Sequence, residues 1–201
     1  MDILIPQLEQ LTQRQQEIIY KSIKIISEQG LQHLTIKNIS AAIGVTERAI
    51  YRHFKSKSDI IITIVNVFRK NMSQVFKKLQ AEEHTPIESI DRFFEIHFEN
   101  FNNNPYMTVL LFSDEMFRET EGLSNFLQSI INMAQKNVAK MIEKGQKVGQ
   151  VRDDIKAIDL ALMLLGTYRL FILNWHLGGH KADLTKTGEE VRKLILGVLC
   201  K

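Results

Sequence analysis

Polar side chains able to bind nucleic acid are concentrated in one stretch, residues 35–57, with the sequence TIKNISAAIGVTERAIYRHFKSK. Its second half carries guanidinium, phenol, imidazole and ammonium groups in close succession: Arg48, Tyr51, Arg52, His53, Lys55 and Lys57. Donors of these kinds suit the phosphate oxygens of nucleic acid and the exposed edges of its bases. The stretch therefore predicts a surface that binds DNA.

The same stretch predicts the two short helices that would position these side chains. Isoleucines recur at helical spacing in its first half, and a second short apolar face follows after Gly44. Gly44 can take the positive φ that ends a helix, and the Thr46 hydroxyl can cap the next one. Two helices joined by so short a turn form a helix-turn-helix, whose second helix can enter the major groove. An ordinary αα-hairpin with a solvated polar face fits the same periodicity.

The stretch resembles the DNA-binding domain of TetR-family transcriptional regulators. The matching residues are Thr35, Ile39, Ala42, Gly44, Val45, Thr46, Ile50, Tyr51, His53, Phe54 and Lys57. It departs from the family at Ser40, where alanine is more frequent, and at the charged pair Glu47 and Arg48, where the operator is read. The resemblance implies phosphate contacts from Thr35, Tyr51, His53 and Lys57. Base contacts are expected from Lys37, Glu47 and Arg48, and Thr46 and Arg52 complete the expected DNA-binding set.

The composition is typical of a soluble globular protein, with 44% hydrophobic and 24% charged residues. Its 201 residues can bury a substantial core, and three prolines, ten glycines and few alternating apolar runs favour an all-α fold. The single cysteine, Cys200, excludes an intrachain disulfide and a cysteine-based zinc site, which fits a reducing cytoplasm. The first ten residues place no basic segment before an apolar run, so we expect a cytoplasmic protein without a signal peptide.

Basic residues are concentrated around the predicted helix-turn-helix. Between residues 12 and 57, eight Lys or Arg stand against three Glu, a balance of +5. The whole chain carries +3, so the remainder carries −2. This distribution agrees with a phosphate-binding surface, although an imbalance of this size decides little on its own.

The resemblance implies two domains in an all-α chain of about nine helices. Residues 1–57 would form an N-terminal arm and a three-helix helix-turn-helix domain, and residues 58–201 a helical bundle for ligand binding and dimerisation. Helix-start signals agree with this organisation: capping boxes begin at Thr12, Ser56 and Thr85, and Asp154 is a candidate N-cap for the penultimate helix.

The segment 155–177 is apolar on nearly every side and is long enough to span a membrane. Four polar residues oppose a membrane span: Asp159, Arg169, Asn174 and His176. We therefore predict a helix buried on two sides, against its own domain and against a second subunit. Together with the apolar stripe of the last helix, it predicts a dimer interface formed by Leu164, Tyr168, Phe171, Trp175, Val191, Leu194, Ile195 and Val198.

The region between Phe68 and Phe126 is rich in phenylalanine and forms either an ordinary helical core or the wall of an effector cavity. The family usually has a cavity, and such a site needs a few polar groups in an apolar wall. The candidate lining residues are Phe94, His97, Phe98, Tyr106, Phe112, Asp114, Phe126, Ile130, Arg169 and His176. Arg169 fits equally well as the partner of an acidic residue in the second subunit, and Trp175 as an interface anchor.

No motif predicts catalysis. The sequence contains no glycine-rich phosphate loop, no HExxH and no GxSxG, and its six histidines lack metal-ligand spacing. We expect no enzymatic activity, metal or cofactor.

The predicted function is that of a homodimeric regulator, most simply a repressor, that binds double-stranded DNA at a palindromic operator. A small, largely apolar effector would release it. Two alternatives remain open: a helical small-molecule carrier with a vestigial DNA domain, and a structural DNA-binding division regulator without an effector.

Overall fold

The computed structural model describes residues 10–112, 120 and 122–200. Within these residues it contains nine α-helices, one short 3₁₀ turn and no strand, so the predicted all-α fold is confirmed. The chain divides into two compact units. The first unit comprises residues 1–72 and 109–123, and the second comprises residues 73–108 and 124–201.

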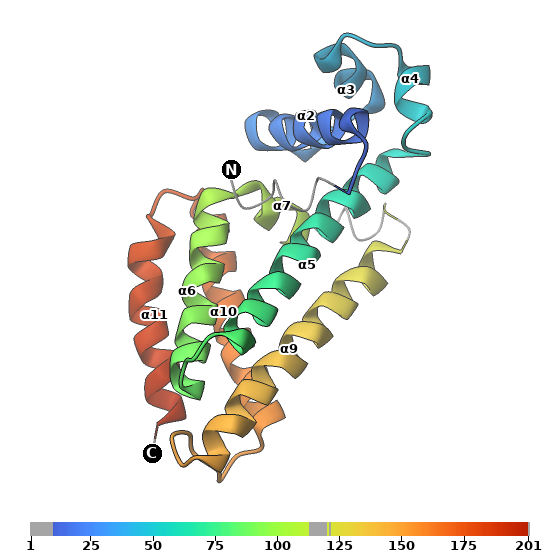
Figure 1. Ribbon diagram of the computed structural model, residues 1–201. Coiled ribbons are helices and arrows are strands. Elements are labelled where there is room, and N and C mark those ends of the chain that lie inside the picture. Colours follow the sequence, from blue (N-terminus) through green and yellow to red (C-terminus); the bar gives the residue numbers. More distant parts are fainter. Residues whose placement is uncertain (1–9, 113–119, 121, 201) are drawn as a thin grey trace. The chain divides into compact units, whose positions relative to one another are not determined.

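The first unit contains the three N-terminal helices (Figure 1). They are α2 (Gln13–Gln29), α3 (Ile36–Ile43) and α4 (Glu47–Tyr51), with the 3₁₀ turn η1 (Leu31–His33) between the first two. Helix α5 (Lys57–Ala81) begins in this unit and ends in the second. Helix α7 (Tyr106–Phe112) begins in the second unit and ends in the first.

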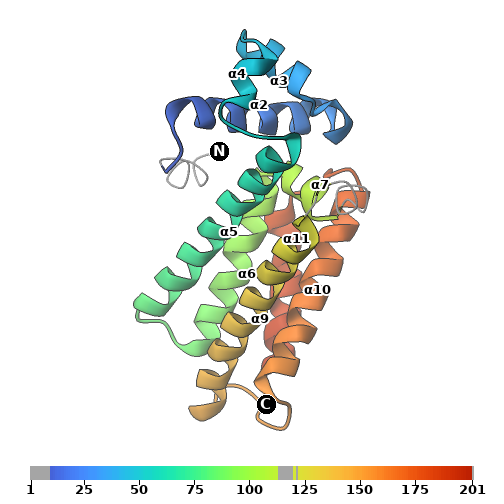
Figure 2. The same ribbon diagram turned by 90° about the vertical axis from the view of Figure 1, so that its right-hand side faces the viewer.

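The second unit contains the long helices α6 (Pro86–Asn103), α9 (Leu123–Lys147), α10 (Ala157–Leu177) and α11 (Leu184–Leu199). Helices α6 and α11 pack side by side at the left of Figure 1, and α11 lies behind α6 in Figure 2. Buried phenylalanines of α6 fill the interior of this unit: Phe93, Phe94, Phe98 and Phe101.

Capping residues set the helix boundaries largely as the sequence predicts. The capping boxes at Thr12 and Thr85 are both formed, with Gln15 and Glu88 as the reciprocal partners. The Ser56 hydroxyl accepts from the Asp59 amide at 3.1 Å, whereas the Asp59 carboxylate accepts from the amide of Lys55 rather than that of Ser56.

The prediction that Asp154 caps α10 is wrong. The N-cap is Lys156, which makes no side-chain capping bond. The Asp154 carboxylate instead accepts two hydrogen bonds from the Arg152 guanidinium, at 2.6 and 2.7 Å. A charge-assisted bidentate pair is stronger than a single hydrogen bond to a backbone amide, so the Asp154 carboxylate binds Arg152 and does not cap the helix.

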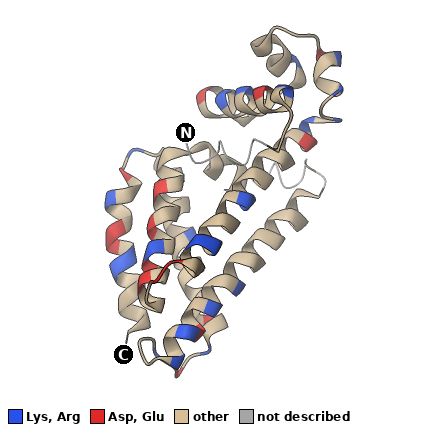
Figure 3. Cartoon of the chain, viewed as in Figure 1, with Lys and Arg blue, Asp and Glu red and all other residues tan. Residues whose placement is uncertain are grey.

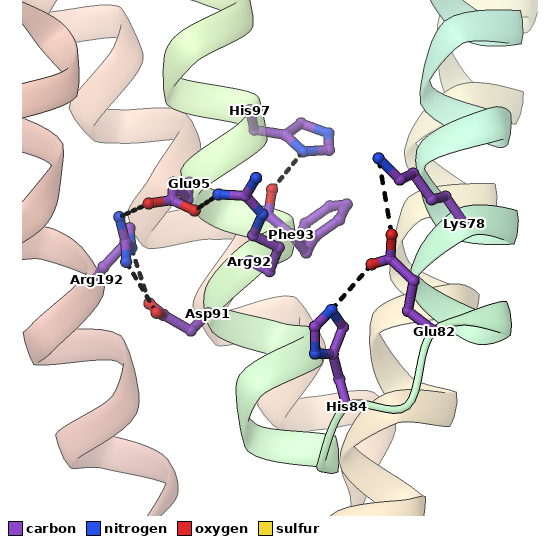
Figure 4. Close-up of polar contacts among 9 residues, drawn as sticks. All are labelled: Lys78, Glu82, His84, Asp91, Arg92, Phe93, Glu95, His97 and Arg192. Atoms are coloured by element: carbon purple, nitrogen blue, oxygen red, sulfur yellow. Dashed lines mark hydrogen bonds and ion pairs between the residues drawn. The ribbon is translucent and has the colours of Figure 1, made fainter.

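An ion-pair network joins α11 to α6 (Figure 4). The Arg192 guanidinium donates two hydrogen bonds to Asp91, both at 2.8 Å, and a third to Glu95 at 3.1 Å. Glu95 also pairs with Arg92. Three charge-assisted bonds from one planar group fix the axial position of α11 relative to α6.

Gly188 of α11 packs closely against the Phe98 ring of α6, and it supplies a first test of this packing. A Cβ atom at Gly188 would lie 2.7 Å from the Phe98 ring, which is itself buried. Gly188→Ala should gain about 1 kcal/mol of helix propensity but lose about 1–3 kcal/mol to overpacking. We expect a net fall in the free energy of unfolding, measured by urea denaturation.

The control is the double variant Gly188→Ala with Phe98→Leu. A leucine side chain withdraws ring atoms from the clash, so the overpacking cost should be smaller in this background. Equal effects of Gly188→Ala in the two backgrounds would show that the predicted clash with the ring is not the cause.

Candidate functional sites

The helix-turn-helix of the first unit is built by capping at three points. The Thr35 hydroxyl accepts from the Asn38 amide at 3.1 Å and begins α3. Gly44 ends α3 in the left-handed conformation, with φ 77°, as predicted. The Thr46 hydroxyl accepts from the Ala49 amide at 3.3 Å and begins α4. The turn between the two helices is therefore fixed by residues 44–46.

Apolar residues anchor α4 and leave its polar side chains accessible. Ile50 and Phe54 are buried, as is Ile39 of α3. Seven of the nine predicted DNA-binding residues are exposed: Thr35, Lys37, Thr46, Glu47, Arg48, Tyr51 and Arg52. His53 and Lys57 are half-buried. Basic positions lie in α4 and in the segment that follows it (Figure 3).

The predicted effector residues are dispersed. Four belong to the aromatic interior of the second unit and are buried: Phe94, His97, Phe98 and Tyr106. In the same unit, Ile130 is buried, Phe126 and His176 are half-buried and Arg169 is exposed. Phe112 belongs to the first unit, and Asp114 lies outside the described residues.

His97 is a neutral core residue. Its Nδ1 atom donates to the Phe93 carbonyl at 2.8 Å, and its ring lies 4.0 Å from the Phe93 ring, centroid to centroid (Figure 4). Burial lowers the pKa of His97 to about 4, against a smaller opposing effect of the bond to Phe93. The imidazole is therefore uncharged at neutral pH, available for hydrogen bonding but not as a cation.

Tyr168 of α10 inserts between four aromatic rings of α6. The ring centroids of Phe94, His97, Phe98 and Phe101 lie 5.2–6.3 Å from that of Tyr168. The Tyr168 hydroxyl and the Asn100 Nδ2 atom are both buried and lack a hydrogen-bond partner among the described residues. Burial raises the pKa of Tyr168, so its hydroxyl keeps its proton. These are two unmet side-chain donors in the part of the core that the structure describes.

Sequence reasoning missed Asn100 and placed Tyr168 elsewhere. The available signal was an amide within the run of phenylalanines on α6, one helical turn after His97. An uncharged amide in a segment without a recognisable motif gives no reason to distinguish it from the neighbouring asparagines Asn102, Asn103 and Asn104.

Tyr168→Phe should leave the free energy of unfolding unchanged or raise it, by up to about 1 kcal/mol. A buried donor without a partner carries a desolvation cost of about 1–3 kcal/mol, which phenylalanine avoids. The matched control is Tyr106→Phe, because the Tyr106 hydroxyl is also buried but donates to Asn104 Oδ1 at 3.2 Å. This control should lose about 0.5–1.5 kcal/mol. Urea denaturation of the ligand-free variants measures both, and a loss at Tyr168 as large as that at Tyr106 would contradict the assignment.

The predicted dimer residues fall into two groups. Leu164, Tyr168, Trp175, Val191 and Ile195 are buried within the second unit, and Phe171 is half-buried. Leu194 and Val198 of α11 are 67% and 40% exposed. In the isolated chain these buried side chains face the interior of their own unit, and their part in a dimer interface stays a prediction. An apolar stripe on α10 is exposed in their place: Ile158, Leu162, Met163, Leu170 and Leu177.

Helix α10 is the one described helix that is long and apolar enough to cross a membrane. Length and composition alone make this weak evidence, because core helices of soluble proteins pass the same test. The exposed apolar stripe on α10, and the exposed Leu194 and Val198 on α11, nevertheless require an explanation, since exposed apolar patches mark interaction sites.

Two protein-family models match nearly the whole chain. A model described as bacterial regulatory proteins of the tetR family matches residues 18–64. A second, described as the C-terminal region of a YsiA-like protein, matches residues 68–198.

Individual relatives are distant but similar over their full length. The transcriptional repressor KstR2 of Mycobacterium tuberculosis is 19% identical over 193 residues, which cover 96% of each chain. The fatty acid degradation regulator FadR of Bacillus halodurans has a similar structure, with a TM-score of 0.77, 20% identity and coverage of 92% of this chain and 95% of that one. FadR of Bacillus subtilis in complex with stearoyl-CoA has a TM-score of 0.74, 20% identity and coverage of 91% and 98%.

Proposed function

The chain belongs to the TetR family of bacterial regulatory proteins, and we propose that it represses transcription as a cytoplasmic homodimer on a palindromic operator. The observation that carries this proposal is the accessible polar face of α4, held in place by the buried side chains of Ile50 and Phe54. A short helix whose apolar side is anchored and whose polar side is exposed is suited to the major groove.

Arg48 is the central candidate for reading bases. It is exposed in the first turn of α4, where recognition helices usually contact base edges. Glu47 beside it and Lys37 on α3 are the further candidates. We assign phosphate contacts to residues before and after these positions in the sequence: Thr35, Tyr51, His53 and Lys57. Such contacts orient the protein on the duplex without reading the base sequence.

Arg48→Ala should weaken binding to the specific operator by about 1–3 kcal/mol and relax the preference for one base pair. Lys57→Ala should weaken specific and non-specific DNA alike and reduce the salt slope by about one unit. The operator is first obtained by selecting bound DNA from random oligonucleotides, and affinities are then measured by fluorescence anisotropy.

The matched control is Lys140→Ala, which removes an exposed charge from α9 in the second unit. It should bind the operator as the unmutated protein does. Failure to select any DNA sequence would reject the operator, and equal binding by all three variants would reject the assignment of Arg48 and Lys57.

We propose a long-chain acyl thioester as the effector. The interior of the second unit is formed mainly by phenylalanine, leucine and isoleucine, which suits an acyl chain. The Tyr168 hydroxyl and Asn100 Nδ2 are buried donors without a partner among the described residues, and either would suit a carbonyl oxygen. The Bacillus subtilis FadR, which shares this fold, was solved with stearoyl-CoA. Helix α5, which contributes to both units, is the candidate link from the effector to the helix-turn-helix.

The effector is tested by adding stearoyl-CoA to the operator complex, with free CoA as the control. A hundredfold loss of DNA affinity corresponds to about 2.7 kcal/mol of coupling, within the usual range. Linkage requires the operator to weaken stearoyl-CoA binding by the same factor. A ketosteroid is the second ligand to test, because KstR2 of Mycobacterium tuberculosis is a ketosteroid transcriptional regulator. If neither stearoyl-CoA nor the ketosteroid changes the DNA affinity, both proposed effector classes are rejected.

A further inference from the structure

Two imidazoles and one hydroxyl meet at the C-terminal end of α10. The Thr108 Oγ1 atom lies 2.8 Å from His176 Nδ1 and 2.9 Å from His180 Nε2. The two ring nitrogens are 3.2 Å apart. Thr108 is fully buried, whereas both histidines are half-buried and reachable from solvent. All three residues belong to the second unit.

The local backbone holds His180 in this cluster. His180 has a φ of 60°, which is uncommon for a residue with a side chain, and it follows Gly179 at φ 72°. Its amide donates to the Trp175 carbonyl at 3.1 Å, and its ring lies 4.4 Å from the Trp175 ring, centroid to centroid. The Trp175 indole N–H donates to the Ala182 carbonyl at 2.8 Å, which holds the segment that follows His180. The position of the imidazole is therefore determined by the fold.

The spacing of the three atoms matches one face of a metal coordination shell. Ligands about 2.1 Å from an ion are separated by about 3.0 Å in octahedral and about 3.4 Å in tetrahedral geometry. The three observed separations, 2.8, 2.9 and 3.2 Å, are nearest to an octahedral face. Both ring nitrogens lie within hydrogen-bond distance of the same hydroxyl oxygen, so the three donor atoms form one compact triangle.

We propose that Thr108, His176 and His180 bind a divalent ion of the late first transition series. Imidazole nitrogen suits Ni²⁺, Cu²⁺ and Zn²⁺, and the two histidines would supply most of the affinity. The threonine hydroxyl is a weak third ligand, and water completes the shell. We expected no metal from the sequence, because two histidines four positions apart at a helix end are unremarkable without the hydroxyl supplied by α7.

The electrostatics and the donor count are consistent with a site of modest affinity. Burial, and to a lesser extent the neighbouring His176, lower the pKa of His180, which favours the neutral ring that a metal requires. Among the described residues no group of three His, Cys, Asp or Glu is positioned to hold an ion, so the two imidazoles are the strong ligands that these residues supply. Its affinity should therefore be lower than that of a structural zinc site.

The competing explanation is a hydrogen-bonded cluster that needs no ion. The Thr108 hydroxyl donates to the Pro105 carbonyl at 2.7 Å and can then accept from an N–H of each imidazole. In that arrangement both nitrogens carry protons, and a metal would have to displace them. The two explanations differ in whether Ni²⁺ selects this pair of histidines over the four others in the chain.

The test is a Ni²⁺ titration of the full-length protein without an affinity tag. Paramagnetic Ni²⁺ should broaden the ring NMR signals of His176 and His180 at lower metal concentration than those of the other histidines. His180→Asn should reduce the Ni²⁺ affinity, measured by calorimetry, by about tenfold or more. Asparagine tolerates positive φ, so this variant preserves the backbone conformation.

The matched control is His84→Asn, which removes an exposed histidine paired with Glu82 and should leave the Ni²⁺ affinity unchanged. Thr108→Val, which keeps the shape of the side chain, should lower the affinity less than His180→Asn does. The proposal is overturned if the signals of all accessible histidines broaden together, or if His180→Asn binds Ni²⁺ as tightly as the unmutated protein. Neither result depends on the operator or the effector.

Discussion

Replacing Leu194 and Val198 together by glutamate is expected to produce monomers that bind a palindromic operator about a thousandfold more weakly or worse. Both side chains are exposed on α11, as the apolar stripe is on α10. Two symmetry-related helix pairs would form a four-helix bundle there, and four buried carboxylates would prevent its assembly. A monomer retains a single recognition helix, so its affinity should fall towards non-specific binding.

Sedimentation velocity at micromolar concentration measures the assembly, and fluorescence anisotropy measures the affinity for the operator. The control is Lys77→Glu, which changes the charge at an exposed position of α5 without touching the stripe. The proposed interface is rejected if the unmutated protein sediments as a monomer. It is also rejected if the double variant still sediments as a dimer.

The second large effect is a loss of stability in acid that originates in His97. Its pKa is about 4 in the folded protein and about 6.5 in the unfolded chain. Between these values the unfolded chain binds more protons than the folded one, so stability falls as the pH falls from about 6.5 to about 4. Relative to its value above pH 6.5, the free energy of unfolding should therefore be about 3 kcal/mol lower at pH 4 because of His97 alone.

His97→Gln isolates this contribution, because glutamine does not titrate. Urea denaturation at several pH values should show a free energy of unfolding that falls by about 3 kcal/mol less in His97→Gln than in the unmutated protein. Carboxylates that titrate in the same range affect both proteins and cancel in the comparison. His84→Gln, at an exposed position, should follow the unmutated protein. Parallel curves for His97→Gln and the unmutated protein would show that the ring is not buried in its neutral form.

Local signals in the sequence predicted the helix-turn-helix and most helix starts. Thr12, Thr35, Thr46 and Thr85 all cap helices, because a hydroxyl accepting an amide bond depends on residues only three positions away. The φ of Gly44 follows from the same kind of short-range geometry. Asp154 shows the limit of this reasoning, because a nearby guanidinium competes for its carboxylate.

The orientation of α10 was not accessible to the same reasoning. In a helix that is apolar nearly all round, the sequence does not show which side faces the core. It therefore does not distinguish Tyr168, which is buried, from Leu170, which is 59% exposed. The buried side is determined by contacts with α6, where Tyr168 packs against four rings, and these contacts join residues about 70 positions apart. The proximity of Thr108 to His176 and His180 is a long-range contact of the same kind.

Gly166 of α10 and Gly197 of α11 are both exposed, and in the proposed dimer they would link the lifetime of each chain to its copy number. A Cβ at either position would meet nothing within 4 Å in the isolated chain. Each glycine weakens its helix by about 1 kcal/mol relative to alanine. In the proposed dimer they would allow the partner's helices to approach closely, and association would offset that loss by mass action. A cell holding few molecules would then contain more unpaired chains, which open more readily and are degraded sooner. The regulator would be short-lived when scarce and long-lived when abundant.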